Sequence, residues 1–339
     1  MMKLSTIGID LAKRVFQVHG VDEAGRVVLR RQVRRSQVLE VFSQIEPCLV
    51  GMEACGSANH WARELKKLGH EVRLISPQFV KPYVKSNKND VADAEAICEA
   101  VSRPNMRFVP MKELEYQDIQ SIHRARTLLV KQRTAVANQI RGLMAEYGVV
   151  VAQGLGQLRK QLPGCLGDAE NGLSATARDV ICCLSEQLRW FDERIAGFER
   201  RLEQVVRENE VCQHLKEIPG VGTMTATALY AAVNHAKEFR NGRQLAAWLG
   251  LVPRQHSSGG KPTLLGISKR GDRHLRTLLI HGARAGTRVA RNSHSAEARW
   301  LSSLIERRGY NRATVALANK MARKAWVVLN RGERIAAPA

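Results

Sequence analysis

The first third of the chain alternates apolar and polar residues with a period of two, which is typical of half-buried β-strands. Polar turns such as Asp22–Gly25 separate these short segments, and stretches with helical spacing follow them. The pattern predicts strands at Leu4–Ile9, Val15–Val21 and Val27–Val33, a helix from Ser36, a strand at Cys48–Met52, a helix at Ser57–Leu68, a strand at Val72–Ile75 and a helix after Asp90. An antiparallel meander followed by alternating helices and strands indicates an α/β domain.

The middle of the chain, from about Glu113, has helical spacing throughout. Apolar residues in Ser174–Asn209 recur at alternating steps of three and four, the heptad spacing of a coiled coil: Ile181, Leu184, Leu188, Phe191, Ile195, Phe198, Leu202 and Val205. A weaker stripe precedes it at Leu129, Val136, Ile140, Leu143 and Tyr147. We expect the two helices to pair across a Gly/Gln-rich loop at residues 153–172. An intramolecular antiparallel hairpin and an intermolecular coiled coil fit this pattern equally well.

After Cys212 the sequence is helical and basic, and a glycine-rich loop from Pro253 to Gly266 interrupts it. The expected organisation is therefore an α/β domain at 1–110, a helical coiled-coil or dimerisation segment at 111–210, and a mainly α-helical basic domain at 211–330. A length of 339 residues is consistent with more than one domain.

The charge of the chain is strongly positive and unevenly distributed. Lys and Arg number 53 against 32 Asp and Glu, a formal net charge of +21. Residues 213–339 contain 22 Lys and Arg but 6 Asp and Glu, so most of the excess lies there. Neutralising phosphates releases counterions, which makes nucleic acid the leading partner for such a chain. A basic structural or ribosomal protein is the alternative that charge alone leaves open.

The cysteine content and the hydropathy pattern limit the cellular setting. Seven cysteines, with no C-x-x-C pair, argue against a disulfide framework and a zinc knuckle, and favour a reducing compartment. The longest uncharged run, Ile218–Ala236, is interrupted by Pro219, two glycines, Asn234 and His235. We therefore expect a soluble protein with no membrane-spanning segment.

Four acidic residues stand at the ends of predicted elements. Asp10 closes the first strand, Glu53 closes the fourth, and Asp90 and Asp93 share one face of the following helix. Carboxylates that converge need a cation among them, and hard oxygen ligands suit Mg²⁺ or Mn²⁺. Two such ions could hold the attacking and leaving oxygens of a phosphoryl transfer. Taken singly, Asp90 could be a helix N-cap and Asp93 a solvated acid that favours the helix dipole.

The segment Ile218–Gly222, followed by a helical run, resembles a helix-hairpin-helix. In that motif glycines such as Gly220 and Gly222 let backbone N–H groups approach a DNA phosphate at a helix N-terminus. A plain turn between two helices is the alternative.

The segment Leu249–Lys261 places two serines and two glycines between cationic groups. Arg254, Lys261, Lys269, Arg270 and Arg273 could hold phosphate oxygens, and a serine hydroxyl could attack phosphorus if a base or a metal activated it. The segment is neither a Walker A loop nor a nucleophile elbow, because its glycines are differently spaced. On chemistry alone, a phosphate-binding loop without catalysis is favoured.

Taken together, these motifs resemble those of the DEDD/serine insertion-sequence transposase family. The resemblance rests on Asp10, Glu53, Asp90 and Asp93, on Pro219–Gly222, and on Ser257–Lys261. It implies a ribonuclease H-like front domain, similar to the RuvC Holliday-junction resolvase, whose four acids hold Mg²⁺ or Mn²⁺. It also implies that Ser258, with Ser257 as the adjacent alternative, attacks the DNA backbone and becomes joined to it.

The resemblance further implies the partners and the setting. A structured guide RNA would pair with the element ends and the target DNA, and protomers would join as a dimer or a tetramer through the helical segment. The protein would be bacterial, cytoplasmic and nucleoid-associated. His256, His274 and His281 are interpreted as phosphate contacts or surface residues, and Cys55 as a packing residue.

Three functions remain in competition. The first is transposition, in which strands are cut and rejoined through a phosphoserine bond with help from metal. The second is a metal-dependent nuclease similar to Holliday-junction resolvases, in which the serine loop only grips DNA. The third is a non-enzymatic nucleic-acid scaffold, which would leave the four acids unexplained.

Overall fold

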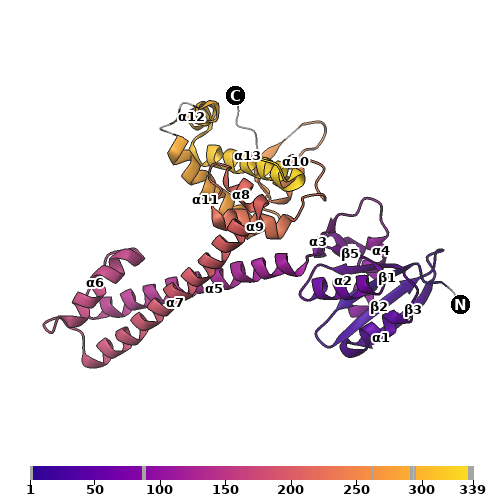
Figure 1. The fold of residues 1–339 in the computed structure, drawn as a ribbon, viewed down its shortest axis with the longest axis horizontal. Coiled ribbons are helices and arrows are strands. Elements are labelled where there is room, and N and C mark those ends of the chain that lie inside the picture. Colours follow the sequence, from indigo (N-terminus) through magenta and orange to yellow (C-terminus); the bar gives the residue numbers. More distant parts are fainter. Residues whose placement is uncertain (1–2, 86–88, 262, 291–292, 294, 335–339) are drawn as a thin grey trace. The chain divides into compact units, whose positions relative to one another are not determined.

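A computed structural model describes residues 3–85, 89–261, 263–290, 293 and 295–334. The chain divides into two compact units, residues 1–115 and residues 116–339 (Figure 1). The first is built on a mixed sheet and the second is almost entirely helical. Among the described residues, no helix is both long enough and apolar enough to cross a membrane.

The sheet of the first unit has the order β3-β2-β1-β4-β5-β6. Its strands are β1 (Thr6–Leu11), β2 (Val15–Val21), β3 (Val27–Arg34), β4 (Leu49–Glu53), β5 (Glu71–Ile75) and β6 (Phe108–Val109). The first three form the antiparallel meander that the sequence predicts. β4 and β5 then continue in parallel with β1. This arrangement is compatible with the predicted ribonuclease H-like domain; the short β6 was not predicted.

Helices cover the sheet and bury its apolar residues. They are η1 (Arg35–Gln37), α1 (Val38–Ser43), α2 (Ala58–Lys67), α3 (Pro77–Val80), η2 (Lys81–Tyr83) and α4 (Asp90–Val101). Ile7, Phe16, Val50 and Leu65 are fully buried in one cluster of the core. The helical patterns predicted both ends of α2 and the starts of α1 and α4 to within two residues, whereas α3 and η2 were missed because each is about one turn long.

The position of α4 on the sheet depends on two glycines. A Cβ at Gly8 of β1 would lie within 3.0 Å of the backbone of Ala94 and Cys98, and one at Gly51 of β4 would lie equally close to the side chain of Val101. Because neither glycine has a side chain, α4 lies directly on β1 and β4.

In the second unit, two long helices, α5 (Leu114–Glu146) and α7 (Ala175–Glu208), pair in antiparallel orientation within the chain (Figure 1). Arg126 of α5 pairs with Glu199 of α7, and Arg133 pairs with Asp192 at 2.9 Å. Four seam residues spaced seven apart, Ile181, Leu188, Ile195 and Leu202, are buried, and the intervening four are half-buried.

The prediction of a Gly/Gln-rich loop at residues 153–172 is wrong, because most of this segment forms a helix, α6 (Leu155–Gly167). Leu158 and Leu162 of α6 are buried in a cluster with Ile140 of α5 and Ile181 of α7. Burial of this leucine stripe outweighs the weak helix propensity of the glycines and of Pro163.

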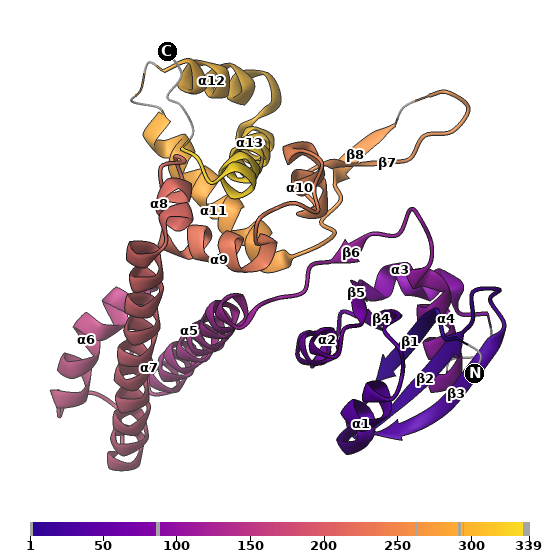
Figure 2. The same ribbon diagram turned by 45° about the vertical axis from the view of Figure 1, so that its right-hand side comes forward.

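The remainder of the second unit packs around one large apolar core. It contains α8 (Glu210–Lys216), α9 (Thr223–Val233), α10 (Gly242–Trp248), α11 (Arg273–Ala290), α12 (Ala296–Arg308) and α13 (Tyr310–Arg331). The expected glycine-rich loop at Pro253–Gly266 is instead an antiparallel ribbon of β7 (Pro253–Gln255) and β8 (Leu264–Ile267), which projects from the helices of this unit (Figure 2).

Candidate functional site

Asp10 and Glu53 lie at the same edge of the sheet. β1 pairs with β4 in parallel, with Gly8 opposite Gly51 and Ile9 opposite Met52, so the next residues along the two strands are Asp10 and Glu53. Both residues are half-buried. The pKa of the nearby Cys55 thiol is raised, first by desolvation of its sulfur and then by the negative charges of Glu53 and Asp10. The charges of the two carboxylates therefore both reach Cys55, as expected for residues at neighbouring strand ends.

Asp90 and Asp93 lie in the first turn of α4. Asn89 is the N-cap, and its side chain accepts a hydrogen bond from the amide of Ala92, so the N-cap alternative for Asp90 is wrong. Cys98 contacts the carbonyl oxygen of Thr6, and Ala94 lies against Gly8. Since four helical residues and two strand residues both advance about 6 to 7 Å, the same register continues towards Asp90 and Asp10.

Side chains two apart on a strand point to the same face, so Asp10 shares the α4-facing side with Gly8, and Glu53 shares it with Gly51. The four acids therefore belong to one side of the sheet. Within the part of the chain that the structure describes, no three of them come close enough together to coordinate one ion. Asp10 and Glu53 form the pair at the sheet edge, and the two acids of α4 stand above the same face.

Ser258 lies at the tip of the β7–β8 ribbon. Gly259 and Gly260 have φ of +56° and +75°, and the amide of Lys261 donates to the carbonyl oxygen of Ser258 at 3.1 Å. Two central residues with positive φ are characteristic of a type I′ turn, which fits the twist of a two-stranded ribbon. A Cβ on either glycine would meet nothing within 4 Å, so their backbone conformation, and not packing, requires glycine here.

The hydroxyl groups of the two adjacent serines differ. Ser257 Oγ accepts hydrogen bonds from the amide of Thr263 at 3.1 Å and from Gln255 Nε2 at 3.0 Å. No hydrogen bond of the Ser258 hydroxyl to another described residue is recorded, and Ser258 is exposed. Ser257 thus helps to hold the ribbon together, while Ser258 presents its hydroxyl to solvent.

The five cationic residues predicted around the serines are all exposed: Arg254, Lys261, Lys269, Arg270 and Arg273. The backbone of two of them, Lys269 and Arg270, is held firmly. Lys269 has φ of +54°, and a Cβ at Gly250 would lie within 3.0 Å of the backbone of Arg270. The side chain of Arg276 donates to the carbonyl oxygens of Leu249 and Arg270, at 3.0 and 2.9 Å. No local pattern indicates that Arg276 is a structural residue, since it stands in a run of cations.

The segment predicted to be a helix-hairpin-helix folds as α8, a turn at Ile218–Val221, and α9, an arrangement that a plain turn between two helices would also show. Its two glycines have different environments. A Cβ at Gly220, where φ is +87°, would lie within 3.0 Å of Gly282 in α11, so this glycine is required for packing inside the protein. Gly222 is exposed with open space around it, at the start of α9. Gly222 is thus the one of the two that a phosphate could approach.

The histidines and Cys55 only partly follow the sequence interpretation. His256 and His281 are exposed, but His274 packs against His123 with its Nε2 buried and without a hydrogen-bond partner among the described residues. Cys55, expected to pack, is exposed. The burial of His274 arises from its contact with His123, a residue distant in the sequence.

Comparison with known proteins gives the family. A family model described as "Transposase", for DEDD-type transposases of IS110, matches residues 7–149, and one described as "Transposase IS116/IS110/IS902 family" matches residues 212–323. The chain is 53% identical over 331 residues to a probable family 20 transposase of Pseudomonas aeruginosa, covering 97% of this chain and 98% of the relative. It is 50% identical to the transposase for insertion sequence element IS1111A of Coxiella burnetii, covering 98% of this chain and 92% of the relative.

The chain belongs to the IS116/IS110/IS902 family of insertion-sequence transposases. The first match includes all four acids of this transposase, and the DEDD type of that domain indicates dependence on a divalent metal ion. The second includes the hairpin at Gly220 and Gly222, the ribbon with Ser258, and the cationic residues that follow it. As a transposase, the protein acts on DNA.

Proposed function

We propose that the transposase cuts and rejoins DNA strands at the ends of its insertion sequence through Ser258. The observation that carries this proposal is the ribbon tip, where a rigid Gly-Gly turn presents the Ser258 hydroxyl to solvent while Ser257 is engaged in the ribbon. Five exposed cations within the same segment supply charge for the phosphates of the strand.

The chemical step conserves the number of phosphoester bonds. Ser258 Oγ loses its proton and bonds to phosphorus, and the bond from phosphorus to one deoxyribose oxygen breaks, so that this oxygen leaves with a proton. A hydroxyl of another DNA strand then attacks the phosphoserine and restores Ser258. Because the bond energy is kept in the phosphoserine, rejoining needs no separate energy source.

We further propose that Asp10, Glu53, Asp90 and Asp93 hold the divalent ion, Mg²⁺ or Mn²⁺. The donors are hard carboxylate oxygens on one side of the sheet, which suits these ions. The bound ion would supply Lewis-acid stabilisation of charge on phosphate oxygens. The protein's own contribution is to fix Asp10 and Glu53 on adjacent strand ends and to place α4 directly on Gly8 and Gly51.

The remaining parts of the proposal concern partners. A structured RNA of the element would guide the choice of target, with the excess of positive charge in residues 213–339 supporting binding of more than one strand. The half-buried seam residues of α7, such as Leu184 and Phe191, offer a surface through which protomers could join as a dimer or a tetramer. The three predicted domains remain our proposal for the functional division of the chain.

The experiment compares wild type, Ser258→Ala and Ser257→Ala, each incubated with the element ends, the flanking RNA and Mg²⁺. Protein joined covalently to DNA is detected on a denaturing gel. We expect the adduct to form with wild type and to disappear in Ser258→Ala. Ser257→Ala should retain it at reduced yield, because only the ribbon is weakened.

The same assay decides the alternatives. Cleavage without an adduct, unchanged in both serine variants, would instead favour a resolvase-like nuclease in which the carboxylates carry the chemistry. Asp10→Ala should bind less metal, measured by calorimetry with Mn²⁺, while its circular dichroism remains that of the wild type. Loss of fold in Asp10→Ala would contradict a purely functional role for this acid.

A further inference from the structure

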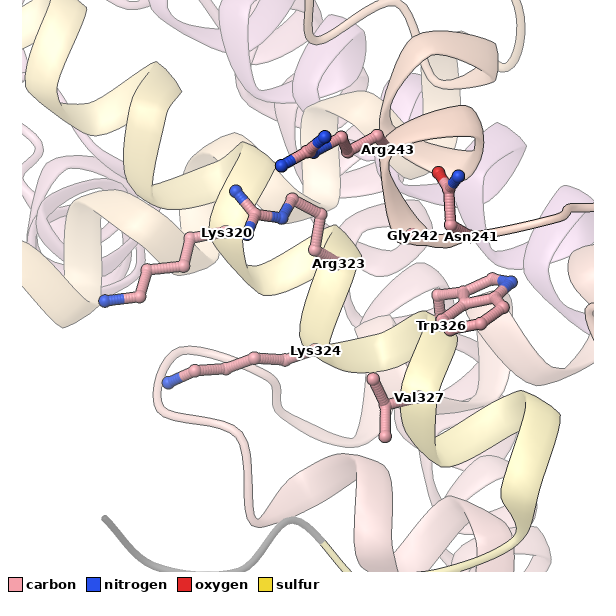
Figure 3. A pocket seen from close by; sticks show the side chains of 8 residues that line it. All are labelled: Asn241, Gly242, Arg243, Lys320, Arg323, Lys324, Trp326 and Val327. Atoms are coloured by element: carbon pink, nitrogen blue, oxygen red, sulfur yellow. The ribbon is translucent and has the colours of Figure 1, made fainter.

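A pocket of about 410 Å³ opens between α10 and α13 in the second unit (Figure 3). Its rim carries four cationic side chains, Arg243 of α10 and Lys320, Arg323 and Lys324 of α13, and its apolar part includes Trp326 and Val327. None of these residues belongs to the serine ribbon or to the hairpin at Gly220 and Gly222. The pocket is therefore a feature that the proposed chemistry leaves without a role.

The wall of the pocket is fixed by contacts between α10 and α13. Gly242 lies so close to α13 that a Cβ there would come within 2.9 Å of the Cα and the carbonyl oxygen of Arg323. Trp326 Nε1 donates to the carbonyl oxygen of Phe239 at 3.0 Å, which orients the indole ring. The cations thus project from a rigid base, which reduces the entropy lost when a ligand binds.

The charge of the pocket is largely uncompensated. Lys320 and Lys324 both contact Glu297, Lys320 at 3.7 Å and Lys324 at 2.5 Å. Arg243 and Arg323 are exposed and form no ion pair with any described acidic residue. Four cations against one carboxylate leave an excess of three positive charges. The side chains of Arg243 and Arg323 extend towards the same side of the pocket (Figure 3), and guanidinium groups bind phosphate oxygens in a bidentate manner.

A second cavity, of about 740 Å³, connects this pocket with the ribbon. Lys320 and Arg323 line both cavities, and the second is also lined by Pro253 and Leu265 of the ribbon and by Arg312 of α13. Cations of α13 therefore line both the pocket and the cavity that reaches the base of the ribbon whose tip carries Ser258.

We propose that this pocket and the adjoining face of α13 bind the phosphodiester backbone of a nucleic-acid strand on its way to the ribbon. The binding site follows from the charge and shape of the pocket, and only the strand's destination at Ser258 rests on the proposed function. DNA and RNA carry the same backbone phosphates, so the experiment includes both. A single strand could also place a base against the apolar part of the pocket, next to Trp326.

The test uses the full chain with Arg243→Gln and Arg323→Gln combined. Glutamine keeps much of each side-chain stem, so the packing of Gly242 on α13 is preserved. The matched control combines Arg308→Gln and Arg331→Gln, which removes two exposed cations of α12 and α13 that do not line the pocket. Dissociation constants for duplex DNA, single-stranded DNA and single-stranded RNA of one sequence are measured over a range of salt concentrations.

We expect the pocket variant to bind at least one of these probes about tenfold more weakly, and the slope of log affinity against log salt to flatten by about two. The control should stay close to wild type. The probe with the largest loss identifies the strand. Equal losses in the two variants, or no loss in the pocket variant, would overturn the inference.

The result is independent of the serine chemistry, because binding and not cleavage is measured. If wild type forms no covalent adduct and the pocket variant still loses affinity, the serine mechanism is wrong and phosphodiester binding by the pocket is confirmed. If the adduct forms and the pocket variant binds normally, the serine mechanism is confirmed and phosphodiester binding by the pocket is wrong.

Discussion

The imidazole rings of His123 in α5 and His274 in α11 meet edge to face, with their centroids 5.5 Å apart. His123 is buried, and its Nε2 lies 3.0 Å from the hydroxyl oxygen of Thr227 in α9. Three helices far apart in the sequence therefore meet at His123 inside the second unit, α9 through a polar contact and α11 through a ring contact. The pKa of His123 is lowered to about 4, chiefly by burial and then by the charges of the neighbouring His274 and Arg126.

This contact makes the stability of the second unit depend on pH. Between pH 6.5 and about 4 the unfolded chain binds a proton at His123 while the folded chain does not, so stability falls as the pH falls through that window. The pKa of His274 is lowered as well, chiefly by burial, which adds to the same trend, although Asp272 opposes it. For His123 alone the loss is on the order of 3 kcal/mol.

The measurement is amide hydrogen exchange of α9, corrected for the intrinsic dependence of exchange on pH. Protection should fall between pH 6.5 and 4 in wild type and fall less in His123→Gln, where the glutamine amide can still contact Thr227. His281→Gln, at an exposed position of α11, serves as the control and should behave as wild type does. An unchanged pH dependence in His123→Gln would rule out this histidine as the cause.

The ribbon should tolerate alanine very differently at Gly259 in its tip and at Gly266 in β8. Gly259→Ala places a Cβ at φ of +56°, which costs about 1–2 kcal/mol in the left-handed region. We expect the type I′ turn to be less populated and covalent adduct formation to slow at least several-fold. Gly266→Ala, where open space surrounds the glycine and φ is not left-handed, should leave the rate unchanged. Equal rates in the two variants would show that the turn does not position Ser258.

In the first unit, alanine at Gly8 should reduce stability and Mn²⁺ binding far more than alanine at Gly56. A Cβ at Gly8 would collide with the backbone of α4, and backbone atoms cannot move aside alone, so Gly8→Ala should destabilise this unit by about 1–3 kcal/mol. Displacing α4 should also weaken Mn²⁺ binding, because Asp90 and Asp93 move with it. Gly56→Ala meets nothing within 4 Å and should be neutral in both thermal unfolding and calorimetry. If folded Gly8→Ala binds Mn²⁺ with normal affinity, Asp90 and Asp93 are not ligands of the metal ion.

Asp192 should matter more to the helical hairpin than its neighbour Glu193. Its carboxylate pairs with Arg133 at 2.9 Å and with Arg159 of α6 at 2.6 Å, so it joins all three helices of the hairpin. The arginines are partly exposed, and we expect Asp192→Asn to cost only about 1 kcal/mol, less at high salt. Denaturant unfolding at two salt concentrations measures this, with Glu193→Gln as the control. A loss that salt does not reduce would point to packing instead of ion pairing.

The sequence predicted those parts of the fold that depend on local pattern. The apolar residues of β1 and β2 and the heptad seam from Ile181 to Val205 each reflect burial along most of the element, whereas in β3 only Val33 is buried. The prediction of a loop at α6 was wrong because it followed the glycines of the segment and not the helical spacing of its leucines, Leu155, Leu158, Leu162 and Leu166. The ribbon was missed because its exposed strands have no buried face, and only the Gly-Gly pair indicated a hairpin.

The candidate site was predictable where strand order alone fixes neighbours, as for Asp10 and Glu53. The contact of His123 with Thr227 and His274, and the structural role of Arg276, bring together residues that no local pattern connects. The pocket was likewise not predictable from local pattern, because the packing of Gly242 on α13 is what brings Arg243 and Arg323 to one pocket.

The contact between Gly220 and Gly282 has a mechanical consequence. Each glycine faces the other's carbonyl oxygen with no side chain between them, so the turn before α9 rests on the backbone of α11. Flexible side chains absorb small displacements, whereas two abutting main chains transmit them. A displacement of Gly222 caused by a bound strand would therefore be transmitted to α11. The N-terminus of α11 is Arg273, one of the cations that follow the serine ribbon, so the displacement would reach that segment.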